Sequence, residues 1–492
     1  MAKLINKFTT FMRGSIIFLL IIDVIVAVGL IGISIEGFNT SVLVFGFTAL
    51  LAAFLGYKFI NINTSSKNKL VLILIIGLSL RVLWLLNVNS IPTSDFKIIF
   101  DSAGNFINGD RSMFYGTSYF GRFPHLTIIT LYMAFIRYMF PVSNLLIVKL
   151  INLICSILVL ILIYYITNKL YMNKEYALKG ALIGAIFPPF ISYVGVFCSE
   201  NLAMPFYLLS ICLFLNAVQI KNKLRLYILC GVTLALGNLF RMVAVIVLVS
   251  YVIYILMYLR NKLFEKFKEI SLLIASYAII ICIISSTLQI LRITEYPLWK
   301  GSEPNITSVL KGTNYNSLGA WNAEDAKIID DNIGNYEGLE NLSKKIIRER
   351  LANTSFFKLG IFYLEKFSLV WSAGDCSGVL WSQKDVNENT IMFPVKELKN
   401  INIPLSTIFQ IIYVLVLMLV LAGLFNKSTL KLIREINLFY LILCGYGLTY
   451  LITEAQPRYS YIISWVFIIL AINGLNYIKI FRNSFVFSNE FL

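Results

Sequence analysis

The chain alternates between long apolar runs and shorter polar stretches. Because a helix needs about 20 largely apolar residues to cross the hydrocarbon core of a bilayer, each long run predicts one membrane-spanning helix. Such runs lie near residues 15–34, 41–57, 70–87, 144–166, 178–197, 201–218, 226–240, 242–259, 269–291, 404–424, 436–452 and 459–478. The pattern therefore predicts an all-α, polytopic membrane protein with about twelve spanning helices.

The apolar run at 124–140 differs from the others. It is bounded by Pro124 and Pro141 and contains Arg137, so we expect a helix that lies on the membrane surface or is half inserted. With this run left outside the bilayer, the short loops rich in Lys and Arg all fall on one side, as the positive-inside rule requires. These loops lie near residues 58–69, 169–179, 221–225, 260–268, 427–434 and 479–482.

The basic loops determine the rest of the expected topology. Both termini are expected in the cytoplasm of a multi-pass protein of the cell membrane, with external segments at 88–143 and 292–403 that carry interfacial helices. One such helix is expected at Phe356–Trp371, which is apolar but carries charged residues. Four regions result: a two-helix N-terminal extension, a helical module that includes the first external segment, the second external segment, and the C-terminal helices. Their bounds are 1–69, 70–291, 292–403 and 404–492.

Composition agrees with this topology and excludes several functions. Hydrophobic residues make up 58% of the chain and charged residues 14%, which is too apolar for a soluble domain of this length. The cytoplasmic loops account for the net charge of +16, so no nucleic-acid partner is expected. The cysteines form neither a paired framework nor a zinc motif, and the absence of a Walker loop argues against a nucleotide-driven pump.

Unusual polar residues gather where this topology places the external segments and the outer turns. They are Asp95, Arg122, His125, Glu200, Arg241, Glu454 and Arg458. Two of them, Arg241 and Arg458, run against the positive-inside trend in very short loops. Carboxylates of the protein or the phosphate of a lipid are the partners that would explain an arginine at this boundary.

Each of these residues also has a purely structural explanation. Asp95 could cap a helix that begins at Phe96, and the helix dipole would favour Glu200 and Glu454 at helix N-termini. The two arginines could pair with those carboxylates, and a lone histidine after a proline is more often structural than a ligand. Near the outer end of the third span, Arg81 and Trp84 are typical of interfacial anchors.

The combination of carboxylates and arginines on one external surface suits group transfer from a phosphorylated lipid. A carboxylate can remove the proton of an acceptor hydroxyl while fixed cations balance the leaving phosphate. A divalent metal ion held by Asp95 and Glu200 could share the second task. This hypothesis requires Asp95, Glu200, Arg241 and Arg458 to meet in one pocket at the outer membrane boundary.

Several stretches resemble the GT-C superfamily of integral-membrane glycosyltransferases, in particular family 39 and the aminoarabinose-transferase type that use polyprenyl-phosphate sugars. Ser94-Asp95-Phe96, followed by Ala103, Gly104 and Gly109, resembles the first acidic motif of the family. Arg122-Phe123-Pro124-His125 resembles the family segment that follows that motif. Residues 187–201 resemble the second acidic turn of the family, and residues 237–241 resemble its arginine turn. Residues 311–314, 319–322 and 454–459 resemble later family segments. The resemblance extends over residues 70–480.

The resemblance implies a GT-C fold and sugar transfer from a polyprenyl-phosphate donor to an external acceptor. It implies catalytic roles for Asp95, at the first acidic position, and for Glu200, at the second, where many relatives have Asp. Arg241 and Arg458 match positions for the donor phosphate, and we add Arg122, His125 and Glu454 to the expected substrate-binding residues. A membrane transporter or lipid flippase is the alternative, ranked second because the charges lie mostly at helix ends and only Asp23 lies deep in a span. The sequence identifies neither the sugar nor the acceptor.

Overall fold

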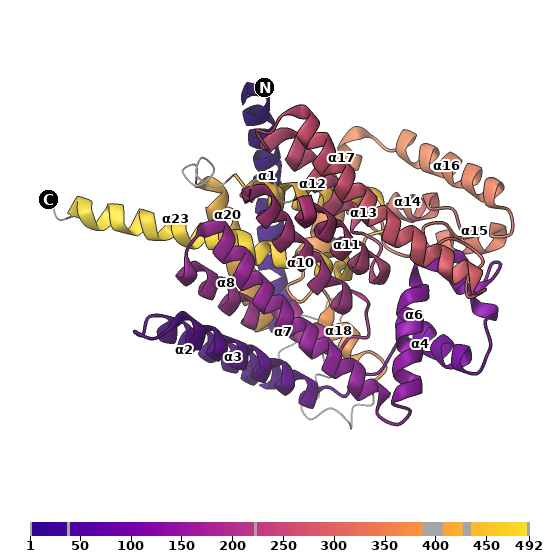
Figure 1. Cartoon of the computed structure of the whole chain (residues 1–492), viewed down its shortest axis with the longest axis horizontal. Coiled ribbons are helices and arrows are strands. Elements are labelled where there is room, and N and C mark those ends of the chain that lie inside the picture. The colour runs from indigo at the N-terminus through magenta and orange to yellow at the C-terminus, as the bar shows by residue number, and fades with distance from the viewer. Residues whose placement is uncertain (1, 37–39, 221–223, 387–406, 427–433, 490–492) are drawn as a thin grey trace.

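The computed structural model describes the chain except for residues 1, 37–39, 221–223, 387–406, 427–433 and 490–492. Parts of two basic loops and the start of the run predicted at 404–424 therefore lie outside the described residues, as does the end of the second external segment. The described part consists of helices and connecting loops without a strand (Figure 1). The prediction of an all-α protein is confirmed.

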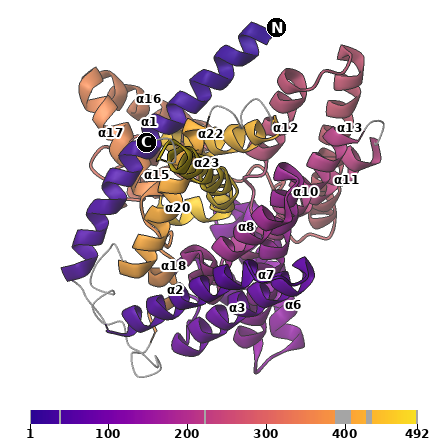
Figure 2. The same ribbon diagram turned by 90° about the vertical axis from the view of Figure 1, so that its left-hand side faces the viewer.

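The long apolar helices form the body of the molecule. They are α1 Ala2–Glu36, α2 Thr40–Ile60, α3 Ser66–Asn87, α7 Asn144–Tyr171, α8 Lys174–Ile186, α10 Glu200–Gln219, α11 Leu224–Phe240, α12 Val245–Tyr258, α13 Leu263–Ile290, α20 Thr407–Phe425, α22 Ile436–Ile452 and α23 Trp465–Asn489. Helix α1 runs diagonally across the other helices (Figure 2) and packs along α20, where the side-chain amide of Gln410 donates to the carbonyl oxygen of Ala27 at 3.0 Å.

Length and composition identify fewer spans than the apolar runs predict. Among the described residues, α1, α3, α7, α10, α13 and α20 are long and apolar enough to cross a membrane, and the number reaches eight if each of two bent helix pairs counts as one span. Helices α11, α12 and α22 are apolar but shorter. A polytopic membrane protein is confirmed, whereas a count of twelve spans is not.

The first bent pair changes direction by 58° between α8 and the short helices α9 Pro188–Ser192 and η3 Tyr193–Gly195. Pro188 cannot continue a helical hydrogen-bond ladder, so α8 ends at Ile186 and its last carbonyls lack their partners four residues on, although Gly184 O accepts weakly from the N–H of Phe187. The fully buried guanidinium of Arg81 donates to two of them, Ala185 O at 3.0 Å and Gly184 O at 3.3 Å.

This arrangement corrects the interpretation of Arg81 and Trp84 as interfacial anchors. Both side chains are buried inside the helix bundle. The charge of Arg81 is stabilised by the negative end of a helix, in place of water at the membrane surface. Arg81 also donates to the hydroxyl of Ser156 at 2.7 Å, which joins α3 to α7.

The second bent pair joins η5 Pro457–Ile463 to α23 at an angle of 65°. Pro457 stands at the first position of η5, where a missing N–H costs nothing. The bend lets the polar residues of η5 approach the ends of other helices.

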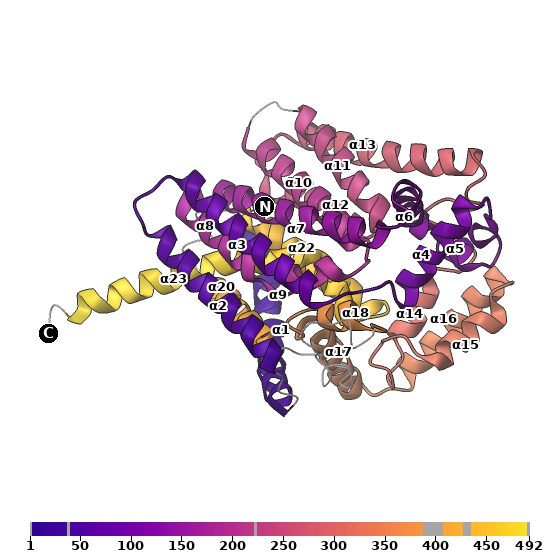
Figure 3. The same ribbon diagram turned by 90° about the horizontal axis from the view of Figure 1, so that it is seen from below.

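The two predicted external segments meet at the end of the molecule opposite the far end of α23, whereas residues 356–383 of the second segment lie nearer its middle (Figures 1 and 3). The first holds α4 Ser94–Ile107, η1 Ser112–Phe114, α5 Tyr119–Arg122, η2 Pro124–Leu126 and α6 Thr127–Met139. The second holds α14 Ile306–Gly312, α15 Ala323–Asn332, α16 Tyr336–Ala352, α17 Phe356–Trp371 and α18 Gly378–Gln383.

Helix α6 and a separate small core give these segments structure of their own. Helix α6 has 13 residues, or about 20 Å at 1.5 Å per residue, which is short of a bilayer core of roughly 30 Å. It packs on α4. In the second segment, α14, α15 and α16 bury an apolar cluster of Leu310, Ile329, Leu339 and Ile347 that is distinct from the main core.

Candidate active site

Asp95 and Arg458 form the first ion pair at the end of the molecule that carries the external segments. Helix α4 begins at Ser94, so Asp95 lies in its first turn, where the helix dipole favours a carboxylate. Its Oδ2 is 3.0 Å from Nη2 of Arg458 on η5. Thr93 occupies the N-cap position and Asp95 is the second residue of the helix, so the explanation of Asp95 as the cap of a helix that begins at Phe96 is wrong.

Glu200 and Arg241 form the second ion pair. Glu200 is the first residue of α10, and Arg241 follows the last residue of α11. Glu200 Oε1 is 3.2 Å from Nε of Arg241, and the Glu200 side chain is only 8% exposed. The turn after α11 is held by Asn238, whose side-chain oxygen accepts from the backbone N–H of Ala244 at 3.1 Å.

Tyr459 joins the two ion pairs. Its ring lies 5.5 Å from the guanidinium carbon of Arg458 and 5.4 Å from that of Arg241. Arg458 also lies 4.9 Å from the ring of Trp381 and 5.7 Å from that of Phe96. Burial alone would lower the pKa of Arg458, but Tyr459 and Asp95 outweigh this effect and raise it. Two guanidiniums and two carboxylates thus converge around one aromatic ring.

Hydrogen bonds fix η5 against the turn that carries Glu200. The hydroxyl of Tyr461 donates to the side-chain oxygen of Asn201 at 2.7 Å, and the Asn201 amide donates to Tyr193 O and Val196 O. The rings of Tyr193 and Tyr461 are stacked with centroids 3.6 Å apart. All of these side chains are buried, so Arg458 and Glu200 are held by a rigid support.

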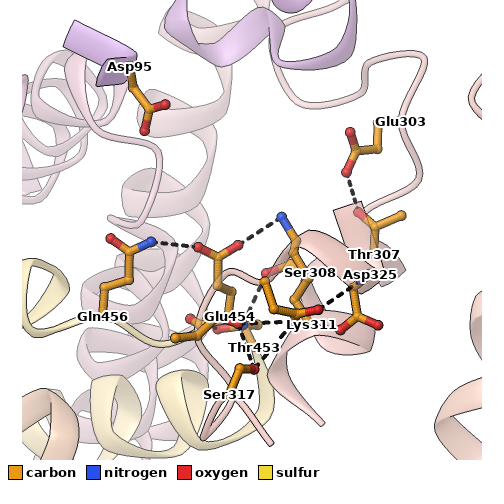
Figure 4. Close-up of polar contacts among 12 residues, drawn as sticks. Asp95, Glu303, Thr307, Ser308, Lys311, Ser317, Asp325, Thr453, Glu454 and Gln456 are labelled. Carbon is orange, nitrogen blue, oxygen red and sulfur yellow. Dashed lines mark hydrogen bonds and ion pairs between the residues drawn. The ribbon is translucent and has the colours of Figure 1, made fainter. Parts of the chain in front are cut away.

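Glu454 connects this group to the second external segment. One carboxylate oxygen accepts from Gln456 Nε2 at 2.9 Å and from the hydroxyl of Tyr459 at 3.0 Å. The other is 2.8 Å from Nζ of Lys311 on α14. Figure 4 shows Glu454 between Gln456 and Lys311. Every carboxylate oxygen of Glu454 is therefore engaged, which suits a structural link more than a proton acceptor.

Arg122 takes part in a different set of contacts. Its guanidinium is 2.8 Å from Glu303 and 2.8 Å from Asp330. Nearby, the backbone N–H of Ser302 donates to Gly121 O at 2.9 Å. Arg122 thus joins the two external segments, and two carboxylates already neutralise the charge that was expected to bind substrate.

His125 is a partly buried residue in η2. Burial, and to a lesser extent the positive charge of Arg241, lowers the pKa of His125 to about 4. The imidazole is therefore neutral near pH 7 and adds no positive charge to the site. Its ring meets that of Phe123 edge to face, with centroids 6.2 Å apart.

The residues present do not fit the metal site that was expected at Asp95 and Glu200. Within the described part of the chain, no group of three or more His, Cys, Asp or Glu side chains gathers as a set of metal ligands. Each of the two carboxylates is instead paired with a guanidinium, and an arginine in that position opposes a cation. We derive no step of the reaction through a metal ion.

Four of the predicted residues thus come together, and other members of the group escaped the sequence analysis. Arg241 and Arg458 both lie beside the ring of Tyr459, and each is paired with a carboxylate, Glu200 or Asp95. Glu454 joins the group by accepting from the hydroxyl of Tyr459. No role was predicted from the sequence for Lys311 on α14, although it lies in the segment 311–314 that resembles the family, nor for Trp381, which lies in the short helix α18. Tyr459 follows Arg458 in the segment 454–459 that resembles the family, but no role of its own was predicted for it.

Comparison with known proteins adds a partial family match. Residues 127–288 match the family model described as dolichyl-phosphate-mannose-protein mannosyltransferase, a region that contains Glu200 and Arg241 but neither Asp95 nor Arg458. No curated protein matches the chain. The family match supports the resemblance to GT-C membrane glycosyltransferases that the sequence motifs indicate.

Among solved structures, the chain is similar to the oligosaccharyltransferase of Archaeoglobus fulgidus in the apo form, with 15% identity and a TM-score of 0.48 over 84% of this chain and 50% of that chain. It is similar to archaeal AglB from Archaeoglobus fulgidus in complex with an inhibitory peptide and a dolichol-phosphate (15% identity, TM-score 0.46, 87% and 52% covered). It is also similar to ArnT from Cupriavidus metallidurans bound to undecaprenyl phosphate (11%, 0.35, 84% and 78%). The chain spans about half the length of the oligosaccharyltransferase chains.

Proposed function

We propose that this GT-C-type membrane protein transfers a sugar from a polyprenyl-phosphate donor to an acceptor hydroxyl on the extracytoplasmic side of the membrane. The observation that carries the proposal is the convergence of the Asp95–Arg458 and Glu200–Arg241 pairs on Tyr459 at the end where the external segments lie. The family match over residues 127–288 supports the same class of reaction.

In the proposed reaction, Asp95 is the general base. It accepts the proton of the acceptor hydroxyl while the oxygen of that hydroxyl attacks the anomeric carbon of the sugar. The bond between that carbon and the phosphate oxygen breaks, and the electron pair leaves with the polyprenyl phosphate. A hexose or pentose donor fits this scheme equally, so the sugar remains a matter for experiment.

Exposure separates the roles of the two carboxylates. The side chain of Asp95 is 40% exposed, whereas that of Glu200 is 8% exposed. An acceptor can therefore reach Asp95, and Glu200 serves to orient Arg241 and to balance its charge. Removing one partner of such a buried pair leaves an uncompensated charge.

The two arginines stabilise the negative charge that develops on the leaving phosphate. Each guanidinium has five N–H donors in a planar fork, and the ion pairs with the carboxylates use only part of them. Arg458 meets Asp95 through Nη2 and keeps a buried Nε without a hydrogen-bond partner, whereas Arg241 meets Glu200 through its Nε. Such preorganised donors in a water-poor site strengthen as charge builds up in the transition state.

The test is sugar transfer by the purified protein in lipid nanodiscs, with a labelled polyprenyl-phosphate sugar and a soluble acceptor. Asp95→Asn keeps the shape and one oxygen acceptor for Arg458 but removes the base, and we expect a loss of about 10²-fold or more. The matched control is Asp101→Asn on the exposed face of the same helix, which should retain activity. Full activity of Asp95→Asn would refute the assignment.

Mass spectrometry of envelope glycans from cells with and without the gene identifies the sugar and the acceptor. The transporter alternative is tested in parallel by measuring lipid flipping in proteoliposomes. Flipping without any sugar transfer would replace the proposed function with that alternative.

A further inference from the structure

We propose that Lys149 is an additional binding residue for the phosphate of the lipid donor. The inference deepens the proposed function and rests on it. Lys149 lies in the second turn of α7 and is buried, with only 7% of its surface exposed.

The other polar side chains on the face of α7 that carries Lys149, those of Asn152 and Ser156, are hydrogen-bonded. Asn152, three residues later, donates to Val194 O at 3.3 Å and to Val196 O at 3.1 Å. Ser156, one turn further on, donates to Phe190 O at 3.1 Å and accepts from Arg81. These residues lie on one side of the helix because positions three, four and seven apart share a face.

Lys149 itself has weak partners. Its ammonium contacts the side-chain oxygen of Asn89 at 3.5 Å, at the limit of a hydrogen bond, and lies 5.9 Å from the ring of Phe197. An ammonium carries three donors, and an interior position is costly for it unless oxygen atoms or an anion compensate. Among the described residues, no carboxylate pairs with Lys149.

The two contacts place Lys149 between the segments that carry the catalytic group. Asn89 belongs to the loop between α3 and α4 that leads to Asp95, and Phe197 belongs to the turn that leads to Glu200. Asn89 is exposed, so an anion that displaces its side-chain oxygen can reach the ammonium from the surface.

Charge balance points to an anion at this position. The ion pairs of the group match three cations, Arg241, Arg458 and Lys311, with three carboxylates, Glu200, Asp95 and Glu454. Lys149 adds one positive charge that nothing in the described chain neutralises. A phosphate monoester supplies the negative charge and several acceptor oxygens, and its contact with an ammonium is a charge-assisted hydrogen bond.

The test measures phosphate binding separately from catalysis. The full chain in nanodiscs is titrated with a polyprenyl phosphate, with the corresponding neutral polyprenol and with inorganic phosphate, and the shift in thermal unfolding reports binding. We expect the affinity of Lys149→Met for polyprenyl phosphate to fall at least tenfold, while Lys149→Arg stays within a few fold of the parent. Lys97→Met, an exposed lysine close to Asp95, is the control and should bind as the parent does.

Stability of the ligand-free protein distinguishes a binding role from a structural one. Because the unpaired ammonium is costly without its anion, Lys149→Met should unfold at the same temperature as the parent or higher. A lower unfolding temperature with unchanged phosphate affinity would overturn the proposal and make Lys149 a structural contact to Asn89. An equal loss in Lys97→Met would also overturn it, because the effect would then be one of general surface charge.

The ligands separate the two sources of phosphate and the two proposals. If inorganic phosphate competes with polyprenyl phosphate for the parent but not for Lys149→Met, Lys149 recognises the phosphate anion. If the parent binds inorganic phosphate but not polyprenyl phosphate, the lipid donor is not the ligand of Lys149 and the proposal is overturned. If the parent binds and transfers from a polyprenyl-phosphate sugar and Lys149→Met does the same, only this inference fails. If the parent shows neither binding nor transfer, the proposed function itself fails.

Discussion

At the scale of single residues, Tyr459 contacts both arginines of the candidate group and Glu454. Its ring lies beside both guanidiniums and its hydroxyl donates to Glu454. Cation–π contacts contribute about 0.5–1 kcal/mol when exposed and about 2 kcal/mol when desolvated. Two such contacts at one partly buried ring are enough to decide where both arginines point.

Substitutions of Tyr459 separate its ring from its hydroxyl. Tyr459→Phe keeps the ring, and Glu454 retains Gln456 and Lys311 as partners, so we expect most of the transfer activity to remain. Tyr459→Leu removes both cation–π contacts and should lower kcat/KM by about tenfold or more, which corresponds to roughly 1.4 kcal/mol. Steady-state transfer kinetics measure both variants. Equal activity of the two variants would show that the ring does not position the arginines.

Some residues of the site could be predicted from the sequence, and others could not. Arg241 and Arg458 were identified because a positive charge in a short outer turn violates a topological rule that needs no structure. Lys149 could not be found in the same way, because it lies within an apolar run that reads as a span. Arg122 was placed at the site from its position near Asp95 in the sequence, but its partners Glu303 and Asp330 come from the second external segment.

At the scale of helices, the segment that carries the site depends on a lysine in α17. The ammonium of Lys366 donates to Gly312 O at 2.6 Å, to Leu451 O at 2.8 Å and to Thr453 O at 2.7 Å. These carbonyls belong to the end of α14, the end of α22 and the residue before Glu454. Burial, opposed by Glu454, lowers the pKa of Lys366 to about 8, so the ammonium is still mostly protonated at pH 7.

Removal of this lysine should affect both stability and activity. Lys366→Met leaves buried carbonyls without a donor, at a cost of about 1–3 kcal/mol each where no other partner exists. We expect a lower unfolding temperature and slower transfer, because the segment with Glu454, Arg458 and Tyr459 loses its anchor. Lys358→Met on the exposed face of the same helix is the control. Transfer at the parental rate in a folded Lys366→Met protein would contradict this role.

Helices were easier to predict than their contacts. Apolar runs located the long helices, and Pro188 coincides with the first bend, whereas Pro457 marks the start of η5 and the second bend follows at Ser464. The prediction of an interfacial helix at Phe356–Trp371 used only the amphipathic pattern of that segment. That pattern says nothing of the three carbonyls around Lys366, since they come from segments that the chain brings together only when folded.

At the scale of the whole molecule, the proposal depends on which side of the membrane holds the external segments. The two segments meet at one end of the molecule (Figure 3), where Arg122 joins them through Glu303. Contacts across both segments mean that they must share one side. The positive-inside pattern of the basic loops predicts that this side is extracytoplasmic.

Labelling of introduced cysteines tests this sidedness directly. Helix α13 has 28 residues, or about 42 Å at 1.5 Å per residue, so its two ends lie on opposite sides of a bilayer core of roughly 30 Å. Lys262 is an exposed residue just before its start, and Asp331 is an exposed residue in α15 of the second external segment. In intact cells, a membrane-impermeant maleimide should label Asp331→Cys, whereas Lys262→Cys should react only after permeabilisation. The parent chain, whose exposed Cys282 lies within the apolar part of α13, provides the baseline. Labelling of Lys262→Cys but not Asp331→Cys in intact cells would place the ion pairs in the cytoplasm and would remove the extracytoplasmic acceptor from the proposed reaction.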